Sequence, residues 1–325
     1  MKKRPNHPIM NVKRQVTIVM SATSTFLTVD SGGSKTTLTL FSSSNECIKE
    51  TTVKGFGTAT DSTEILTELQ GILQHFCVGF TVQSVVCNLG GRNKTQFSAT
   101  LQDTFPLATI LVFRESEGAA GVELCRMHAA QVALLAGTGS IAIAPVLQNV
   151  VISGGWGANI SDDGSGYAVG LAAVRSALQQ VDGTAPLGTL AKRLTGLTEP
   201  PALLDASAYC DLRDAVRAHM GPFDRAHVAS LAKTVYDCAQ SGDETAIAIL
   251  KKAGTDLANT VLTAASKANV TLQTVVVSGG MVHSKAIWQD EFEQTIRRVH
   301  PLQNVVYLPN GICDAMQTIA KNNMK

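Results

Sequence analysis

Along the chain, segments in which apolar and polar residues alternate are followed by segments with apolar residues at helical spacing, and this order occurs twice. In the first half, apolar residues alternate with polar ones in short segments bounded by turn residues, which is typical of β-strands. Leu66, Leu69, Ile72 and Leu73 then recur at helical spacing. The first half predicts strands over residues 25–30, 36–41, 47–53, 84–89 and 108–113, and helices over 64–73, 94–104 and from Glu117 onward.

The second half repeats the order of strand hairpin followed by strands and helices. Its strands are predicted over residues 131–137, 140–146, 149–154, 274–280 and 304–308, and its helices over most of 167–268, over 285–299 and from Ile312 onward. Residues 243–268 have the strongest helical pattern, with Leu250, Leu257 and Val261 on one face. Two rounds of the same order predict duplicated α/β domains with a ligand between them.

The composition agrees with two domains and argues against some classes of binding partner. A chain of 325 residues that is 45% hydrophobic fits two cores of roughly 150 residues each. The net charge of +1 and a charged fraction of 16% argue against a nucleic-acid partner. No segment reaches the roughly 18 uninterrupted apolar residues of a membrane span. The seven widely spaced cysteines predict reduced core residues of a cytoplasmic protein, with a zinc or iron–sulfur site as the less favoured alternative.

The first 24 residues differ from the rest of the chain. Basic residues precede an apolar stretch, as in a signal peptide, but that stretch is short and is interrupted by Gln, Ser and Thr. We expect residues 1–24 to be a flexible basic extension, or translation to begin at Met10 or Met20.

Glycine-rich turns follow three of the predicted strands. "DSGGSKT" (30–36) and "AGTGSIA" (136–142) each join the first two strands of a round, and "VSGGM" (277–281) ends a late strand. Successive backbone N–H groups in such turns bind anions, and glycine lets a phosphate approach the main chain. Each turn alone is explained by hairpin chemistry, but three in equivalent places favour a phosphate site.

The stretch "GGWGANISDDGS" (154–165) combines glycines, a tryptophan and two carboxylates. A sugar packs its apolar face on an aromatic ring, and carboxylates accept its hydroxyls. Alternatively, Trp156 is a buried anchor and the aspartates cap a helix.

With these turns, the chain from about Phe26 to its end resembles the N-acetylglucosamine kinase and BadF/BadG/BcrA/BcrD ATPase family of the sugar kinase, Hsp70 and actin superfamily. The resemblance implies an α/β fold of two actin-like lobes, 25–128 and 129–310, around a central cleft, with a last helix (311–325) packing back on the first lobe. It also implies ATP and Mg²⁺ in the cleft and transfer of the γ-phosphoryl group to the 6-hydroxyl of an amino sugar. The family often forms dimers.

The resemblance also implies roles for single residues. Asp30 would act catalytically through hydrated Mg²⁺. Lys35 would compensate phosphate charge, unless it is a solvated surface group. The nucleotide would contact Gly32, Gly33, Ser34, Lys35, Thr36, Gly137, Thr138, Gly139, Ser140, Gly279 and Gly280, and the sugar would contact Gly90, Gly91, Gly155, Trp156, Gly157 and Asp162.

Two positions depart from the family pattern. The catalytic base of the family's sugar kinases is an aspartate, and here Glu117 stands at that position, with Glu115 two residues earlier. Glutamate can do the same proton chemistry, but its extra methylene displaces the carboxylate. Ala59 stands where N-acetylglucosamine kinases have an asparagine, and Arg92 or Asn93 would supply replacement contacts unless that loop is simply exposed.

Three functions are compatible with these features. The favoured one is an amino-sugar kinase with Glu117 as base, acting on N-acetylglucosamine or glucosamine. The others are a non-catalytic member that responds to sugar or nucleotide, and an ATPase that drives a partner protein. The last depends in the family on an iron–sulfur cluster, which the cysteine spacing does not support.

Overall fold

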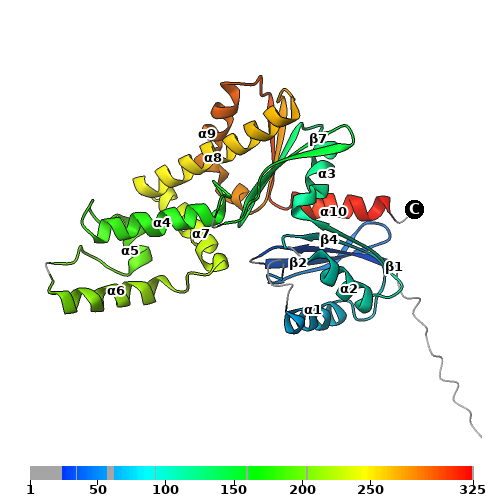
Figure 1. Ribbon diagram of the computed structural model, residues 1–325, viewed down its shortest axis with the longest axis horizontal. Helices are drawn as coiled ribbons and strands as arrows, with labels where there is room; N and C mark the ends of the chain where they lie inside the picture. The colour runs from blue at the N-terminus through cyan, green and yellow to red at the C-terminus, as the bar shows by residue number, and fades with distance from the viewer. Residues whose placement is uncertain are drawn as a thin grey trace, which may run out of the picture.

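The computed structural model describes residues 24–33, 35–56, 62–91, 93–158, 160–202 and 204–323, which form two lobes built on two five-stranded sheets (Figure 1). The first sheet has the strand order β3-β2-β1-β4-β5, and the second has β10-β9-β6-β7-β8. In each sheet three consecutive strands pair antiparallel and two later strands extend the sheet in parallel. The two lobes therefore repeat one topology, as the doubled sequence pattern predicts.

The central strand of the first sheet is buried on both faces. Leu27 and Val29 point into a core with the helices α1 and α2, whereas Phe26 points to the opposite face and stacks on Phe41 with ring centroids 5.0 Å apart. This alternation follows from the two-residue period of a strand. The first sheet contains β1 (Ser24–Ser31), β2 (Lys35–Ser42), β3 (Cys47–Lys54), β4 (Thr81–Leu89) and β5 (Thr109–Arg114), and its helices are α1 (Thr63–Phe76) and α2 (Lys94–Thr104).

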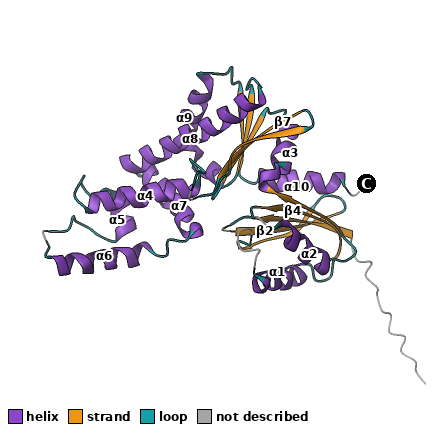
Figure 2. Cartoon of the chain, in the orientation of Figure 1, coloured by secondary structure: helices purple, strands orange, loops and turns teal. Residues whose placement is uncertain are grey.

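The second sheet carries most of the helices, which extend to the left in Figure 2. On β6, Val132 and Leu134 face the core beneath α8, and Ala133 and Leu135 face α3. The strands are β6 (Val132–Ala136), β7 (Ser140–Val146), β8 (Asn149–Gly154), β9 (Thr274–Ser278) and β10 (Asn304–Leu308). The helices are α4 (Gly166–Val181), α5 (Thr189–Thr195), α6 (Ala206–Met220), α7 (Arg225–Gln240), α8 (Glu244–Ala268), the short 3-10 helix η2 (Gly280–Ser284) and α9 (Lys285–Arg297).

Two helices lie where the lobes meet. α10 (Gly311–Asn322) packs through Met316 and Ala320 on the first sheet, beside β1 and β4, and also contacts α3 (Ala119–His128) (Figure 1). α3 packs on the second sheet, so by packing it belongs to the second lobe, although the sequence places the boundary after residue 128. The predicted helix from Glu117 begins at Ala119, because Gly118 has a φ of 74° and separates it from the 3-10 turn η1 (Glu115–Glu117).

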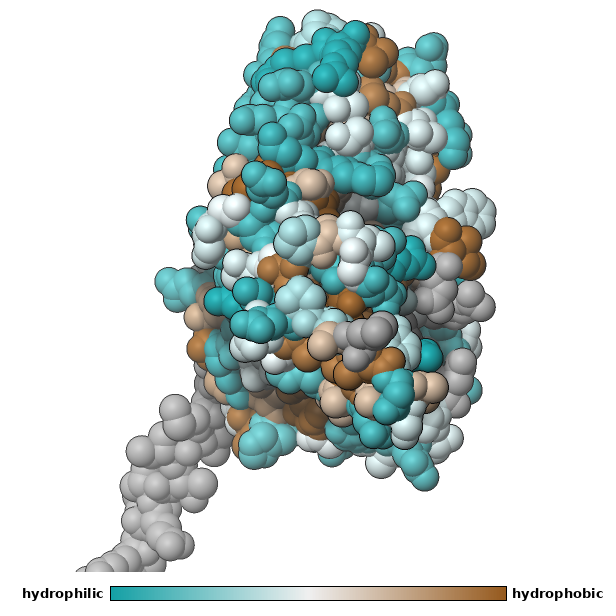
Figure 3. All heavy atoms as spheres, turned by 90° about the vertical axis from the view of Figure 1, so that its left-hand side faces the viewer, coloured by the Kyte–Doolittle hydropathy of each residue, from teal (hydrophilic) through white to brown (hydrophobic). Residues whose placement is uncertain are grey.

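The helical end of the second lobe presents a mixed surface, on which hydrophobic residues are scattered among hydrophilic ones (Figure 3).

Most of the cysteines are buried, as the sequence predicts: Cys77, Cys87, Cys125 and Cys238. Cys47 and Cys210 are exposed, because they lie on an edge strand and on the outer helix α6. Among the described helices, none is long and apolar enough to cross a membrane.

Candidate active site

A cleft with two connected parts lies where the ends of the two central hairpins face each other. The central pocket is lined by the turn after β1, the turn after β6, the end of β9 and the start of α10. The side pocket is lined by the end of β4, by the start of β7, by Trp156 in the turn after β8 and by Asp162. Four residues line both pockets and so mark their junction: Gly90, Glu115, Gly139 and Arg225.

The glycine-rich turns form opposite walls of the central pocket. Gly32 N donates to Lys35 O over 2.9 Å in the first turn, and Gly137 N donates to Gly139 O over 2.8 Å in the second. Gly279 has a φ of 114°, and a Cβ there would lie 2.5 Å from the Ala136 carbonyl oxygen, so only glycine lets β9 approach β6 this closely. The three predicted turns thus meet in one cleft, with Gly33, Thr138 and Gly280 also in its lining.

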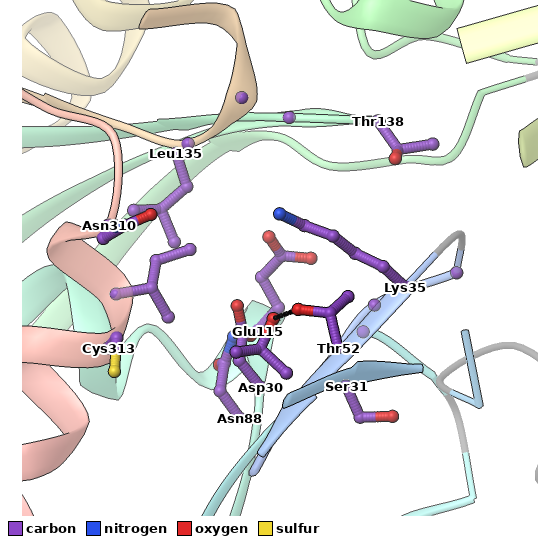
Figure 4. A pocket seen from close by; sticks show the side chains of 18 of the residues that line it. Asp30, Ser31, Lys35, Thr52, Asn88, Glu115, Leu135, Thr138, Asn310 and Cys313 are labelled. Carbon is purple, nitrogen blue, oxygen red and sulfur yellow. Dashed lines mark hydrogen bonds between the residues drawn. The ribbon is translucent and has the colours of Figure 1, made fainter. Parts of the chain in front are cut away.

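Asp30 is a half-buried carboxylate at the end of β1. Asn88, on the neighbouring strand β4, donates from Nδ2 to Asp30 Oδ1 over 3.0 Å. Burial raises the pKa of Asp30 above its ordinary value, and the Asn88 hydrogen bond and the Lys35 charge oppose that rise only in part. Figure 4 shows Asp30, Asn88 and Glu115 close together, with the Lys35 side chain extending into the pocket.

The two glutamates of the turn η1 lie in different surroundings. Glu115 lines both pockets, and burial followed by the charges of Asp30 and Asp162 raises its pKa to about 7. Glu117 is in the lining of neither pocket, and it accepts hydrogen bonds from Lys94 Nζ over 2.8 Å and from Arg114 Nε over 3.1 Å.

Hydrogen bonding also decides how Glu117 titrates. Partial burial raises the pKa of Glu117, but the hydrogen bonds from Lys94 and Arg114 outweigh that effect and hold the pKa below its ordinary value. A carboxylate tied to two cations outside the cleft is poorly suited to accept a proton within it. The structure therefore brings Glu115, rather than the expected Glu117, to the junction of the pockets.

Asp162 lines the side pocket together with Glu115 and Ser116 of η1. It is only 3% exposed, has a φ of 65°, and accepts from Gly157 N over 3.2 Å. Burial raises its pKa, and the Gly157 hydrogen bond and the charge of Arg225 act against that rise. Trp156 lines the same pocket and is 74% exposed, so it is not the buried anchor of the alternative interpretation. The cap of α4 is Ser165, whose Oγ accepts from Ala168 N, rather than either aspartate.

Several predicted contacts lie elsewhere or outside the described residues. Thr36 is fully buried, and its hydroxyl pairs with Ser31 Oγ and accepts from Phe56 N, so it supports the turn from behind. Ser140 lines the side pocket and donates to the Asp163 carbonyl oxygen over 2.9 Å. Gly90, Gly91, Gly155 and Gly157 line the side pocket as predicted. The predictions for Ser34, Ala59, Arg92 and residues 1–23 concern positions outside the described residues.

Arg225 is the residue of the junction that the sequence does not single out. It is the first residue of α7, and its Nη2 lies 3.5 Å from Asp162 Oδ2. In the sequence it follows the N-cap Asp224 and is indistinguishable from a solvated helix arginine. Its place in the cleft is seen only when α7 is packed against the helices α4 and α8.

Comparison with known proteins agrees with this geometry. The chain is 24% identical over 311 residues to an N-acetylmuramic acid/N-acetylglucosamine kinase from Clostridium acetobutylicum, covering 90% of this chain and 97% of that protein. A solved structure from Chromobacterium violaceum, provisionally named an N-acetylglucosamine kinase, matches with a TM-score of 0.67 at 18% identity, over 91% of this chain and 98% of that one. A ROK family glucokinase from Streptomyces griseus, solved with glucose and AMPPNP, matches with a TM-score of 0.61 at 14% identity, over 92% and 99% of the two chains.

These similarities confirm the actin-like fold of the two lobes that the sequence predicts. The model of one family matches residues 27–308, which is most of the chain. The chain therefore belongs to the BadF/BadG/BcrA/BcrD ATPase family.

Proposed function

We propose that the protein is an ATP-dependent kinase that phosphorylates the 6-hydroxyl of an amino sugar, N-acetylglucosamine or glucosamine. One observation carries the proposal: the Glu115 carboxylate lies at the junction of a glycine-walled pocket and a pocket with Trp156 and Asp162. A kinase of small molecules needs this arrangement, because the phosphate donor and the acceptor hydroxyl must meet beside one base.

The central pocket suits the phosphates of ATP. Gly32, Gly33, Gly137 and Gly139 line the pocket without side chains, which lets a phosphate approach the main chain, and Lys35 supplies a positive charge. An apolar pocket continues from Thr138 and Gly280 along one side of α7, past Ala229 and Met281, and has the character expected for an adenosine site.

The donor set near Asp30 fits Mg²⁺ that arrives with the nucleotide. The described residues contain no group of three or more His, Cys, Asp or Glu side chains arranged to hold a metal ion. Mg²⁺ is usually bound by one or two carboxylates together with phosphate oxygens and water, and Asp30 supplies one such carboxylate. The ion would neutralise charge on the β- and γ-phosphates.

The side pocket suits the sugar. The exposed ring of Trp156 offers an apolar face, and Asp162 offers two oxygens that accept sugar hydroxyls. The name of the Clostridium acetobutylicum relative supports a hexosamine as the substrate class. The acceptor hydroxyl would point from this pocket toward Glu115 and the central pocket.

In the reaction, the Glu115 carboxylate accepts the proton of the acceptor hydroxyl. The sugar oxygen forms a bond to the γ-phosphorus as the bond between that phosphorus and the β–γ bridging oxygen breaks, and ADP leaves with the bridging oxygen. A carboxylate with a pKa of about 7 is well matched to proton transfer at neutral pH, since the best catalytic pKa lies near the working pH.

The test is ADP release by the purified protein with glucosamine, N-acetylglucosamine, N-acetylmuramic acid and glucose in turn. We expect turnover that depends on an amino sugar, and phosphorus–proton coupling in the NMR spectrum of the product should assign the phosphate to the 6-oxygen. ADP release that no sugar stimulates would overturn the proposal and favour the non-catalytic or partner-driving alternatives.

A further inference from the structure

The guanidinium of Arg225 is poorly satisfied by the protein. Its Nη2 lies 3.5 Å from Asp162 Oδ2, which is long for a charge-assisted hydrogen bond of about 2.7–2.9 Å. Its Nε is buried and has no hydrogen-bond partner. Arginine has five N–H donors and no acceptor, so donors remain for a ligand that bears negative oxygens.

The fold holds this side chain where the two pockets meet. Gly166 and Gly170 of α4 let α7 pack very closely, and a Cβ at Gly170 would overlap the Val228 carbonyl oxygen. The Asp224 side chain caps α7 by accepting from His227 N over 2.8 Å. A Cβ at Gly139 would lie 3.1 Å from Arg225 Nη2, so the guanidinium touches the glycine turn of the central pocket.

Negative side chains outnumber positive ones around the junction of the two pockets. Asp30, Glu115 and Asp162 bring three carboxylates to it, and ATP adds further negative charge. Among the described residues that line the two pockets, the positive side chains are Lys35 and Arg225. Of these, Arg225 alone lies in the lining shared by both pockets.

We propose that Arg225 is a catalytic residue that donates hydrogen bonds to the phosphoryl group in transit between ATP and the acceptor oxygen. This inference rests on the proposed kinase function. Negative charge on the transferred group is spread over its equatorial oxygens while the bond to the bridging oxygen breaks and the bond to the acceptor oxygen forms. The packing of α7 holds the guanidinium beside Gly139, where its fork of N–H donors stabilises that charge.

The experiment compares Arg225→Met and Arg225→Lys with the unchanged protein. Arg225→Met removes hydrogen bonds that form mainly in the transition state. It should lower kcat by about a hundredfold or more and change the KM values for ATP and sugar by only a few-fold. Lys restores the charge but not the fork of donors, so Arg225→Lys should recover only part of the rate. Added guanidinium should partly rescue Arg225→Ala. Arg217→Met, on the exposed outer face of α6, is the matched control and should keep the full rate.

A second measurement does not depend on turnover. Binding of ADP, Mg²⁺ and aluminium fluoride mimics the transferring phosphoryl group, and calorimetry should find it weakened about a hundredfold in Arg225→Met, with binding of ADP alone unchanged. If the unchanged protein phosphorylated no sugar, the proposed function would fail while this comparison still tested Arg225. Equal affinity of both proteins for the fluoride complex, or a raised sugar KM with normal kcat, would show that Arg225 merely holds Asp162 and would overturn the inference.

Discussion

Glu115 and Glu117 belong to one 3-10 turn, yet Glu115 lines the cleft while Glu117 is held by Lys94 and Arg114 outside it. The separation follows from the turn, because its residues project in different directions as the chain leaves β5 for α3. Two glutamates two residues apart therefore differ in surroundings and in pKa only because their side chains point to different places.

The first prediction separates these two residues. Glu115→Gln removes the proposed base but keeps the size of the side chain, so kcat should fall by about a hundredfold to ten-thousandfold while ATP still binds, as measured by ADP release and by calorimetry. Glu117→Gln loses two partly exposed ion pairs, each worth at most about 1 kcal/mol, and should keep most of the rate. The reverse ranking of the two variants would assign the base to Glu117.

The second prediction concerns pH. Burial and the charges of Asp30 and Asp162 raise the pKa of Glu115 to about 7, and the base must be ionised to act. The value of kcat/KM should therefore rise with pH with a midpoint near 7. Asp162→Asn removes one negative neighbour, so its residual activity should show a midpoint at lower pH, since Glu115 then ionises more easily. A profile that is flat between the acid and neutral range would contradict this role.

The same pKa predicts how stability depends on pH. An acid whose pKa is raised on folding, here from 4.5 to about 7, contributes stability below 4.5 that is lost as the pH rises through 7. Glu115→Gln has no such loss. Its melting temperature relative to that of the unchanged protein should thus be higher at pH values above 7 than at acid pH. Thermal melts of both proteins across this range measure the difference, and parallel curves would contradict it.

The sequence predicts the repeated fold and the walls of the cleft because these depend on local chemistry. Strand alternation, glycine turns and the "GGWG" stretch are each read from neighbouring residues. Glu115, Thr36 and Arg225 depend instead on where a side chain points and what packs behind it. The Thr36 side chain is buried because the alternation of β2 turns it inward, where it accepts from Phe56 N. Arg225 reaches the cleft only through the packing of α7 on α4.

A further prediction concerns Asp30. Asp30→Asn keeps an oxygen that can accept from Asn88 Nδ2 but loses the charge that the proposed site offers to Mg²⁺. Turnover should fall on the order of a hundredfold, and stabilisation by ATP should lose its dependence on Mg²⁺ in thermal shift assays. Because burial disfavours the charged form of Asp30, the variant should also melt at a higher temperature. Asp103→Asn, on the exposed side of α2, is the control, and an unchanged Mg²⁺ dependence in Asp30→Asn would remove Asp30 from the metal site.

The two tryptophans allow another prediction. Trp156 is 74% exposed in the side pocket, and Trp288 is fully buried and donates from Nε1 to the Met281 carbonyl oxygen over 3.2 Å. Trp156→Ala should raise the sugar KM roughly two- to tenfold, the worth of one ring contact, with unfolding free energy changed by less than about 0.5 kcal/mol. Addition of sugar should alter the fluorescence of the unchanged protein and not that of Trp156→Phe. A sugar-dependent signal that persists in Trp156→Phe would place the sugar away from this ring.

The last prediction tests the packing that carries α7 to the cleft. Gly170→Ala inserts a methyl group against the Val228 carbonyl oxygen, and such overpacking costs about 1–3 kcal/mol of unfolding free energy. Gly71→Ala, on the exposed face of α1 with no atom within 4 Å of the added carbon, should instead gain about 0.5–1 kcal/mol from helix propensity. Urea unfolding measures both. Because Arg225 begins α7, Gly170→Ala should also lose turnover at temperatures where it remains folded, whereas Gly71→Ala should not. A folded Gly170→Ala with full turnover would mean that the cleft tolerates displacement of α7.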